Sequence, residues 1–377
     1  MLTTLLLLAG LALLIFGAEA LVRGASRVAA AVGVSPLIIG LTVVAFGTSS
    51  PELAVGARAA LAGSGDVAVG NVVGSNIFNI LVIIGLSATI VPLVVNQQLV
   101  RLDLPLVIVL SLLVLLLGLN GTLGRVEGLL LFLGLLAYVG FQLWISRREG
   151  AEVQTEYVQE FGDARNHSPR RWVVNLGLIA AGLAMLAVGA DWLVDSAASI
   201  ARAFGVSELV ISLTIVAAGT SAPEVATSAM AAVRGERDIA VGNAVGSNIF
   251  NILGVLGLSA ALAPEGIAVS SAALRFDIPV MIAVAVAALP VFFTGYTIER
   301  WEGALFLLLY GGYVLFLYLD AVQSRFLSAY TSVMLLFVLP PVGLTLTLVT
   351  IGELRKRRQA RAQAQQPASQ DASVPNA

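Results

Sequence analysis

Long apolar stretches separated by short polar segments recur along the whole chain. An α-helix needs about 20 apolar residues to cross a bilayer, and windows of that length predict eleven spans. They fall near residues 2–22, 36–61, 67–92, 102–119, 126–146, 172–201, 207–233, 239–262, 276–294, 301–319 and 331–351. A polar loop, 147–171, separates the fifth span from the sixth, and a basic tail that we expect to be disordered follows from residue 352. The pattern predicts an all-α membrane protein.

The composition agrees with this prediction and excludes several kinds of site. Only 12% of the 377 residues are charged, whereas a soluble domain has about a quarter. The chain has no cysteine and one histidine, which excludes disulfides and thiolate metal sites and makes a transition-metal site improbable on ligand grounds. It has no HExxH motif, no Ser/His pair and no nucleotide-binding loop. We therefore expect no enzyme, no cofactor and no nucleic-acid partner.

Two halves of the chain repeat each other. Residues 33–88 align without a gap onto 205–260, and 37 of the 56 aligned positions are identical. The likeness extends on both sides, so that a five-helix unit at 1–146 recurs at 172–320 and an extra helix follows at 321–351. Because five is odd, the second unit enters the membrane from the opposite side. This predicts two inverted five-helix repeats, an architecture typical of secondary transporters.

Basic residues predict the orientation. If the N-terminus lies outside, 16 of the 21 Lys and Arg residues fall on the cytoplasmic side, as expected from the excess of positive charge in cytoplasmic loops. The tail, which includes Arg355 and Lys356, then lies in the cytoplasm near lipid headgroups. We predict a multi-pass protein of the plasma (inner) membrane with the N-terminus outside.

A short polar motif interrupts the second span of each repeat. It reads GTSSPE from Gly47 to Glu52 and GTSAPE from Gly219 to Glu224. An ionisable group at bilayer depth costs about 2.5–3.5 kcal/mol on insertion scales, so it indicates a functional site. The proline removes one helical hydrogen bond and frees a carbonyl. Carboxylate, hydroxyl and carbonyl oxygens are hard ligands that suit Na⁺ and Ca²⁺.

A second motif follows in the next span of each repeat. Residues 70–79 read GNVVGSNIFN and residues 242–251 read GNAVGSNIFN. Polar side chains four residues apart form one stripe on each helix, and the glycines have the spacing that allows close helix packing. The stripes are Asn71, Ser75 and Asn79 in the first copy and Asn243, Ser247 and Asn251 in the second.

Each of these features also has a purely structural interpretation. A proline in a membrane helix often only kinks it, and buried Ser, Thr and Asn often form hydrogen bonds between helices. We expect that simpler role for Asn76 and Asn248, which lie off the stripes. Glu19 and Asp191 match each other in the two repeats, and we expect them near helix ends as interface or cap residues. The coincidence of all the motif elements, twice and in register, favours a functional site.

With these motifs the chain resembles the sodium/calcium exchanger family, within the cation/calcium antiporter superfamily. GTSxPE in one helix and GNxxGSNIFN in the next, each present twice, are similar to the alpha repeats of that family. The resemblance covers the ten-helix core and leaves the eleventh helix and the tail outside it. It implies that the helices containing residues 11–22 and 183–194 slide as a pair to alternate access.

The resemblance also implies the roles of individual residues. The two glutamates would be carboxylate ligands shared by Ca²⁺ and Na⁺, and hydroxyl, carbonyl and amide oxygens would complete the site. The implied ligands are Glu52, Glu224, Thr48, Thr220, Ser49, Ser221, Ser75, Ser247, Asn79, Asn251, Ala45 and Ala217, with Asn71, Asn243, Pro51 and Pro223 in support. Several members have aspartate where Asn251 stands here. Two carboxylates match the charge of one Ca²⁺ or two Na⁺.

The sequence therefore predicts a secondary antiporter that exchanges Ca²⁺ for Na⁺ by alternating access in the lipid bilayer. A Ca²⁺/H⁺ exchanger that uses the same glutamates is the nearest alternative. A passive channel is a further one, although channels more often arrange identical subunits around a pore. Both halves of the site lie in one chain, so a monomer would suffice.

Overall fold

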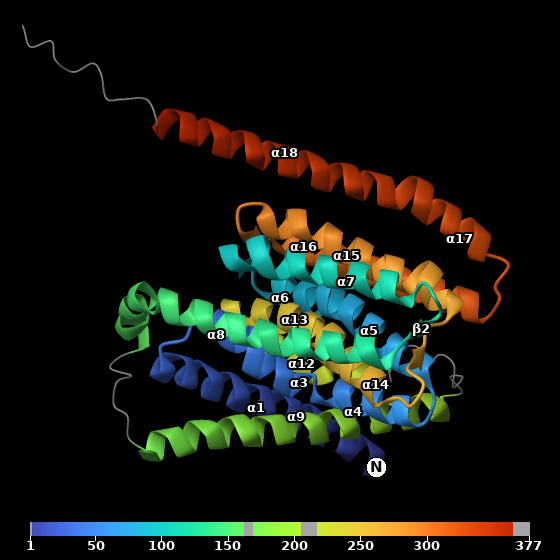
Figure 1. Ribbon diagram of the computed structural model, residues 1–377, viewed down its shortest axis with the longest axis horizontal. Coiled ribbons are helices and arrows are strands. Elements are labelled where there is room, and N and C mark those ends of the chain that lie inside the picture. Colours follow the sequence, from blue (N-terminus) through green and yellow to red (C-terminus); the bar gives the residue numbers. More distant parts are fainter. Residues whose placement is uncertain (1, 162–168, 205–216, 365–377) are drawn as a thin grey trace, which may run out of the picture.

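The computed structural model describes residues 2–161, 169–204 and 217–364, and these residues are almost entirely helical (Figure 1). The first repeat contains α1 Leu2–Val32, α2 Pro36–Ile39, η1 Gly40–Val44, α3 Ala45–Thr48, α4 Ser50–Leu61, α5 Gly65–Phe78, η2 Asn79–Ile84, α6 Gly85–Ile90, β1 Leu93–Val94, η3 Leu99–Asp103, α7 Leu104–Gly118, β2 Thr122–Leu123 and α8 Arg125–Phe161. The second contains α9 Pro169–Ala203, α11 Ala217–Gly219, α12 Ala222–Val233, α13 Arg237–Phe250, η5 Asn251–Leu256, α14 Gly257–Leu262, β3 Ile267–Ala268, η6 Ala273–Asp277, α15 Ile278–Phe293, β4 Thr297–Ile298 and α16 Arg300–Ala321. A last segment contains α17 Leu327–Val333, η7 Met334–Val338 and α18 Leu339–Ala364. The η elements are single π-helical turns within longer helices.

The predicted spans correspond to helices. Nine helices in the described residues are long and apolar enough to cross a membrane, and the bent pair Pro36–Thr48 and Ser50–Leu61 makes a tenth. The predicted span at 207–233 lies partly outside the described residues, which resume at Ala217. The all-α membrane fold with two five-helix repeats and an additional C-terminal helix is therefore confirmed.

Three helices are longer than the apolar windows indicated. α1 ends at Val32 and not near residue 22, and α8 continues to Phe161 through most of the expected polar loop. α18 ends at Ala364, so the first part of the tail expected to be disordered is helical, and residues 365–377 lie outside the described residues. Hydropathy marks the part of a helix that lipid can surround, and a helix can continue beyond that part into water.

Two small sheets join the repeats and show that they are inverted copies. β1 of the first repeat pairs antiparallel with β4 of the second, and β2 pairs in the same way with β3. These are matching pairs, because β1 corresponds to β3 and β2 to β4 in the repeat alignment. Each sheet joins two loops that the charge pattern had placed on the same side of the membrane. The relative topology predicted from the sequence is thus consistent with the strand pairing.

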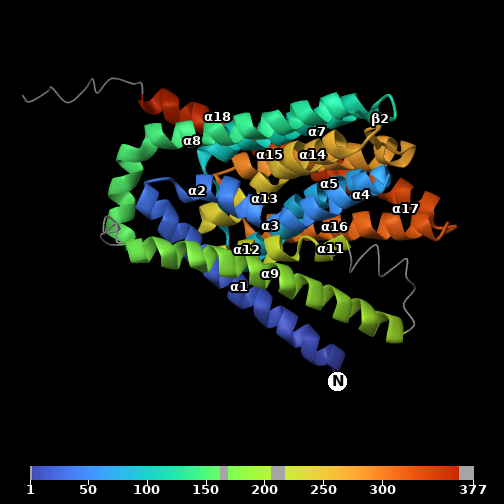
Figure 2. The ribbon, with the colours of Figure 1, turned by 60° about the horizontal axis from the view of Figure 1, so that its bottom comes forward.

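α1 and α9 lie side by side along one face of the bundle (Figure 2). Their backbones approach closely at glycines. A Cβ atom added at Gly10 would lie 2.8 Å from the carbonyl oxygen of Gly189, and one added at Gly182 would lie 2.7 Å from that of Gly17. Real Cβ atoms do not come so close, so these positions require glycine. The two helices that the resemblance identified as a sliding pair therefore form one tightly packed unit.

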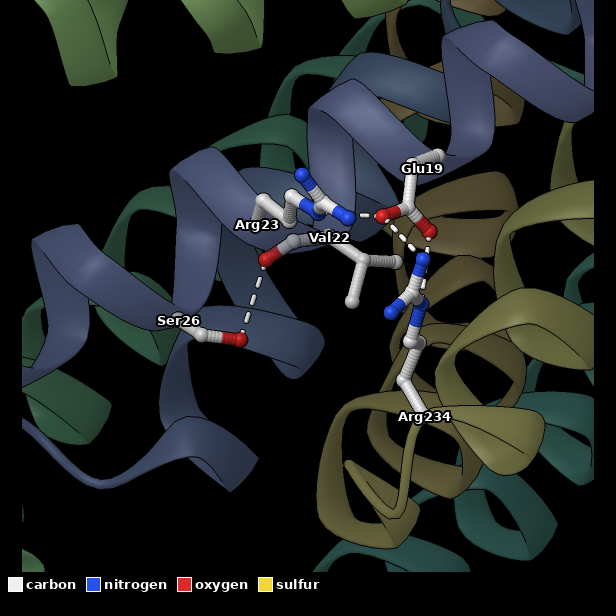
Figure 3. A network of polar contacts seen from close by, with 5 residues as sticks. All are labelled: Glu19, Val22, Arg23, Ser26 and Arg234. Carbon is white, nitrogen blue, oxygen red and sulfur yellow. Dashed lines mark hydrogen bonds and ion pairs between the residues drawn. The ribbon is translucent and has the colours of Figure 1, made fainter. Parts of the chain in front are cut away.

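The sequence predicts Glu19 near a helix end, and this prediction is wrong. α1 continues for another 13 residues to Val32. Its carboxylate forms ion pairs with Arg23, one turn further along α1, and with Arg234 at the end of α12 (Figure 3). Arg234 Nε donates to Glu19 Oε2 over 2.7 Å. Among the described residues, Asp191, the counterpart of Glu19, forms no ion pair. This link between α1 and α12 therefore exists in one half of the molecule only.

Candidate cation site

The GTSxPE motifs break their helices at the positions of the hydroxyl residues. In the first copy α3 ends at Thr48 and α4 begins at Ser50, and the two helices are bent by 48°. Pro51 occupies the first turn of α4 and Glu52 follows it. Pro223 and Glu224 hold the same places at the start of α12. Proline suits a first turn, where no N–H is needed, so each glutamate lies at the N-terminal end of a new helix, next to a break.

The two motifs exchange hydrogen bonds across the repeat interface. Ser49 donates to Glu224 Oε1 over 2.9 Å, and Ser221 donates to Glu52 Oε1 over 3.1 Å. All four side chains are buried. Ser221 Oγ also lies 3.3 Å from the hydroxyl of Ser75. Each carboxylate is therefore held by the serine of the opposite repeat, which places the two glutamates in one central site.

The asparagines at the second position of the GNxxGSNIFN motifs bond to the helices that carry the glutamates. Asn71 Nδ2 donates to the backbone carbonyl of Glu52 over 3.2 Å, and Asn243 Nδ2 donates to that of Glu224 over 3.4 Å. Asn243 also donates to Ser228 over 2.9 Å and accepts from Thr48 over 3.1 Å. Both asparagines therefore bond to the backbone of a glutamate, and their supporting role stays a prediction.

Ten buried side-chain atoms lack a hydrogen-bond partner among the described residues, and five of them are oxygens of residues predicted to be ligands. These five are Glu52 Oε2, Glu224 Oε2, Asn79 Oδ1, Asn251 Oδ1 and Ser247 Oγ. A buried polar atom without a partner costs about 1–3 kcal/mol, so a group of five needs an explanation. All five belong to residues that the sequence identified as ligands, and they comprise carboxylate, amide and hydroxyl oxygens, the kinds that Na⁺ and Ca²⁺ prefer.

Asn79 and Asn251 begin the π-helical turns η2 and η5, at matching points of the two repeats. Such turns inside α-helices are often found at functional sites. The nitrogens of these two amides point across the interface. Asn251 Nδ2 donates to Asn76 Oδ1 over 3.1 Å, and Asn79 Nδ2 donates to Asn248 Oδ1 over 3.2 Å. The amide oxygens are thereby left without partners.

Three further predicted ligands are not among the residues with unpartnered buried oxygens. Thr220 lies in the turn between α11 and α12 and is partly buried, and Ala217 begins α11. The carbonyl of Ala45 accepts from the Ser49 N–H over 3.0 Å, and the Thr48 hydroxyl lies 3.4 Å from it. The ligand roles of these residues, like those of the whole set, stay predictions.

The sequence did not indicate Ser228, and it did not indicate that Asn76 and Asn248 bond to predicted ligands. Ser228 lies one turn after Glu224 on α12 and is buried against Asn243. Asn76 and Asn248 do bond between helices, as predicted, but their partners are the proposed ligands themselves. Their spacing of three residues from Asn79 and Asn251 places each pair on adjacent positions of one helix face, and that spacing was the available signal.

The site contains few charges. The described residues include no group of three or more His, Cys, Asp or Glu side chains that could hold a metal ion. Two glutamates surrounded by neutral oxygens therefore differ from a resident transition-metal centre. They form a buried, polar and nearly symmetric site between two inverted repeats, which is the arrangement of a secondary transporter.

Comparison with known proteins assigns the chain to a family. The family profile described as "Sodium/calcium exchanger protein" matches residues 2–144 and 174–319. The chain therefore belongs to the sodium/calcium exchanger family, and its fold and family are those of a cation/Ca²⁺ antiporter.

Individual relatives agree with this assignment. The chain is 39% identical to the "putative antiporter CaxA" of Alkalimonas amylolytica, over 82% of this chain and 97% of that protein. It is 32% identical to the sodium/calcium exchanger MaX1 of Methanosarcina acetivorans, over 83% and 98%. Its structure resembles that of the sodium-calcium exchanger NCX_Mj soaked with Na⁺ and Sr²⁺, with a TM-score of 0.70 and 30% identity, covering 86% of this chain and 98% of the other.

Proposed function

We propose that this protein exchanges Ca²⁺ for Na⁺ at the site built on Glu52 and Glu224. The observation that carries the proposal is the set of five buried oxygens without partners, which come from both repeats. Ca²⁺ takes six to eight oxygen ligands at about 2.3–2.6 Å, a number that one motif cannot supply and two motifs can. The relatives named as sodium/calcium exchangers support the choice of ions.

Competition between the two cations would produce coupled exchange. Two carboxylates balance one Ca²⁺ or two Na⁺. Moving bare carboxylates through a closed interior of low dielectric would be costly, so the protein would change its facing only with the site loaded. The glycine-packed α1–α9 pair is the element that would slide against the rest. With the N-terminus outside and an inward Na⁺ gradient, the expected direction is Ca²⁺ extrusion from the cytoplasm by a monomer.

Na⁺ is favoured over H⁺ as the counter-ion because of the kind of oxygens in the site. A proton needs one acceptor, and a glutamate alone provides it. Three of the five unpartnered oxygens are amide or hydroxyl oxygens, which can coordinate Na⁺ and take no proton at neutral pH. A Ca²⁺/H⁺ exchanger would leave these three without a role.

Uptake of radioactive Ca²⁺ into proteoliposomes tests the proposal. The vesicles are loaded with Na⁺ and diluted into Na⁺-free buffer, with the membrane voltage clamped by valinomycin and K⁺. A parallel set carries a pH gradient and no Na⁺. We expect uptake that requires internal Na⁺. Uptake driven by the pH gradient alone would move the protein to the proton-coupled alternative, and uptake with neither gradient that does not saturate would indicate a channel.

Glutamate variants test the site in the same assay. Glu52→Gln and Glu224→Gln each keep the size of the side chain and remove one of two charges, so we expect exchange to fall by at least about a hundredfold, equivalent to roughly 3 kcal/mol of lost ligand interaction. Glu265→Gln, at an exposed carboxylate, is the control and should exchange normally. Normal exchange by either site variant would refute the role of these glutamates.

A further inference from the structure

Two asparagines outside the predicted ligand set determine how the central amides are presented. Asn76 and Asn248 lie in the last turns of α5 and α13, where the two helices meet at the repeat interface. Both side chains are buried. Each accepts a hydrogen bond from the amide nitrogen of a ligand candidate on the opposite repeat, Asn251 for Asn76 and Asn79 for Asn248.

The orientation of the Asn76 amide is fixed by a group that can only accept. Asn76 Nδ2 lies 3.3 Å from the backbone carbonyl oxygen of Asn248 and 3.6 Å from the sulfur of Met281. Neither atom can donate, so the NH₂ group of Asn76 must face them. Its Oδ1 therefore faces the other way, toward Asn251.

The orientation of Asn76 in turn determines the orientation of the Asn251 amide. An acceptor at Asn76 Oδ1 selects the nitrogen of the Asn251 amide, which donates to it over 3.1 Å. The oxygen of Asn251 must then lie on the opposite edge of the amide, where it is buried without a partner. If the amide were rotated by half a turn, two oxygens would face each other, and an NH₂ group would point where the oxygen now lies.

The corresponding pair on the other side lacks such an anchor. Asn248 Oδ1 accepts from Asn79, but Asn248 Nδ2 is buried and has no partner among the described residues. Asn248 and Asn79 could therefore rotate together and exchange the roles of donor and acceptor. Sequence symmetry hides this difference, because both repeats read GSNIFN.

We propose that Asn76 is a positioning residue that fixes which atom of Asn251 faces the transported cation. Resting on the proposed function, this inference assigns to Asn76 the presentation of an oxygen, and not an NH₂ group, at a position where this chain has no carboxylate. A cation is attracted by the amide oxygen and repelled by the positive end of the amide dipole. Asn248 has a weaker form of the same role.

Asn76→Ala tests this role, with Asn248→Ala as the matched comparison. Initial rates of Ca²⁺ uptake are measured in Na⁺-loaded proteoliposomes. Loss of one correctly presented ligand should raise the KM for Ca²⁺ about tenfold in Asn76→Ala, with the maximal rate changed much less. Asn248→Ala should raise it about twofold or less, because its amide is not anchored in the wild type. Equal increases in the two variants would contradict the proposal.

An aspartate at 251 separates orientation from packing. Whichever way a carboxylate turns, one of its oxygens faces the cation, so Asn76 is no longer needed to present an oxygen. Asn76 Oδ1 would then face the other carboxylate oxygen, so removing Asn76 should leave the KM for Ca²⁺ of Asn76→Ala/Asn251→Asp equal to that of Asn251→Asp or lower it. A tenfold higher KM in the double variant would show that Asn76 acts through packing, and would refute the proposal. Should the alanine variants aggregate, Asn76→Leu, which preserves more of the volume, replaces Asn76→Ala in both backgrounds.

Direct Ca²⁺ binding separates failure of this inference from failure of the proposed function. Isothermal titration of purified wild type and variants measures the same affinity ratios without any Na⁺ gradient. If wild-type uptake proves to depend on pH, the Na⁺ assignment fails while the binding ratios still test Asn76. If the Asn76→Ala and wild-type affinities are equal, Asn76 has no positioning role, whatever the counter-ion.

Discussion

The two repeats place the same serine–glutamate pairs at the centre of the molecule and differ around them. Ser49 and Ser221 make equivalent bonds to the opposite glutamates, as the paired motifs require. Among the described residues, three polar arrangements beyond these pairs have no equivalent by the repeat symmetry: a buried cluster around Asp103, the Ser228–Asn243 bond and the Glu19–Arg234 ion pair. The bonds between the serines and the glutamates follow the internal symmetry, whereas the arrangements around them do not.

The cluster around Asp103 is the largest of these differences. Tyr138 donates to its Oδ1 over 3.0 Å, Gln142 does so over 2.7 Å, and Gln98 donates to Oδ2 over 3.1 Å. Asp103 is fully buried. Its counterpart, Asp277, is partly exposed and accepts one bond, from Tyr313 over 3.2 Å. Gln142 corresponds to Leu317, so the second repeat cannot build this cluster.

Variants that remove one of these arrangements test what the difference between the repeats contributes. The largest loss of stability is expected for Gln142→Leu, which introduces the residue found at the matching position 317. The variant removes one of the donors to the buried carboxylate of Asp103, and it also removes the acceptor of Gln98. The free energy of unfolding should therefore fall by about 2 kcal/mol. Thermal unfolding in detergent measures this. Leu143→Ala, at the exposed neighbouring position, is the control. Equal stability of Gln142→Leu and wild type would mean that the cluster contributes nothing.

A smaller effect is expected for Ser228→Ala. Its counterpart is Gly56, and alanine removes the hydroxyl without the additional cost of glycine in a helix. Asn243 loses one of its partners, which should cost about 1 kcal/mol and raise the KM for Ca²⁺ a few-fold through the Glu224 backbone. Ser199→Ala, at an exposed serine of α9 that bonds only to its own helix, is the control. If the KM of Ser228→Ala for Ca²⁺ is unchanged, the bond between Ser228 and Asn243 does not influence cation binding.

The smallest effect on stability, and the most informative on mechanism, is expected for Arg234→Ala. Exposed ion pairs contribute about 0–1 kcal/mol, and the Arg234 side chain is 47% exposed, so the unfolding temperature should hardly change. The ion pair joins α12 to α1, which we propose to slide together with α9, and the described residues form no equivalent pair at Asp191. Its loss should therefore alter the ratio of forward to reverse exchange rates when the two gradients are reversed. Arg58→Ala, elsewhere on the matching helix α4, is the control, and an unaltered ratio would exclude a role for the pair in setting the facing.

Much of this molecule could be predicted from its sequence. Apolar windows of membrane length located the spans, and the internal repeat with an odd helix count gave the inverted architecture. Polar groups at bilayer depth are costly, so the two motifs indicated a functional site. The buried oxygens of predicted ligands that lack partners belong to residues of these motifs, namely Glu52, Glu224, Asn79, Asn251 and Ser247. These signals are local, and chain order preserves them.

Other features were decided by the tertiary structure. Helix ends at Val32, Phe161 and Ala364 could not be read from hydropathy, which reports the environment of a helix and not its length. The bond from Asn76 to the Asn248 carbonyl depends on how two helices meet, and it distinguishes residues that the sequence presents as equivalent. Donor and acceptor directions are properties of contacts between distant segments. The sequence alone therefore determined which atoms gather at the centre, and the packing of the repeats determined how those atoms are oriented.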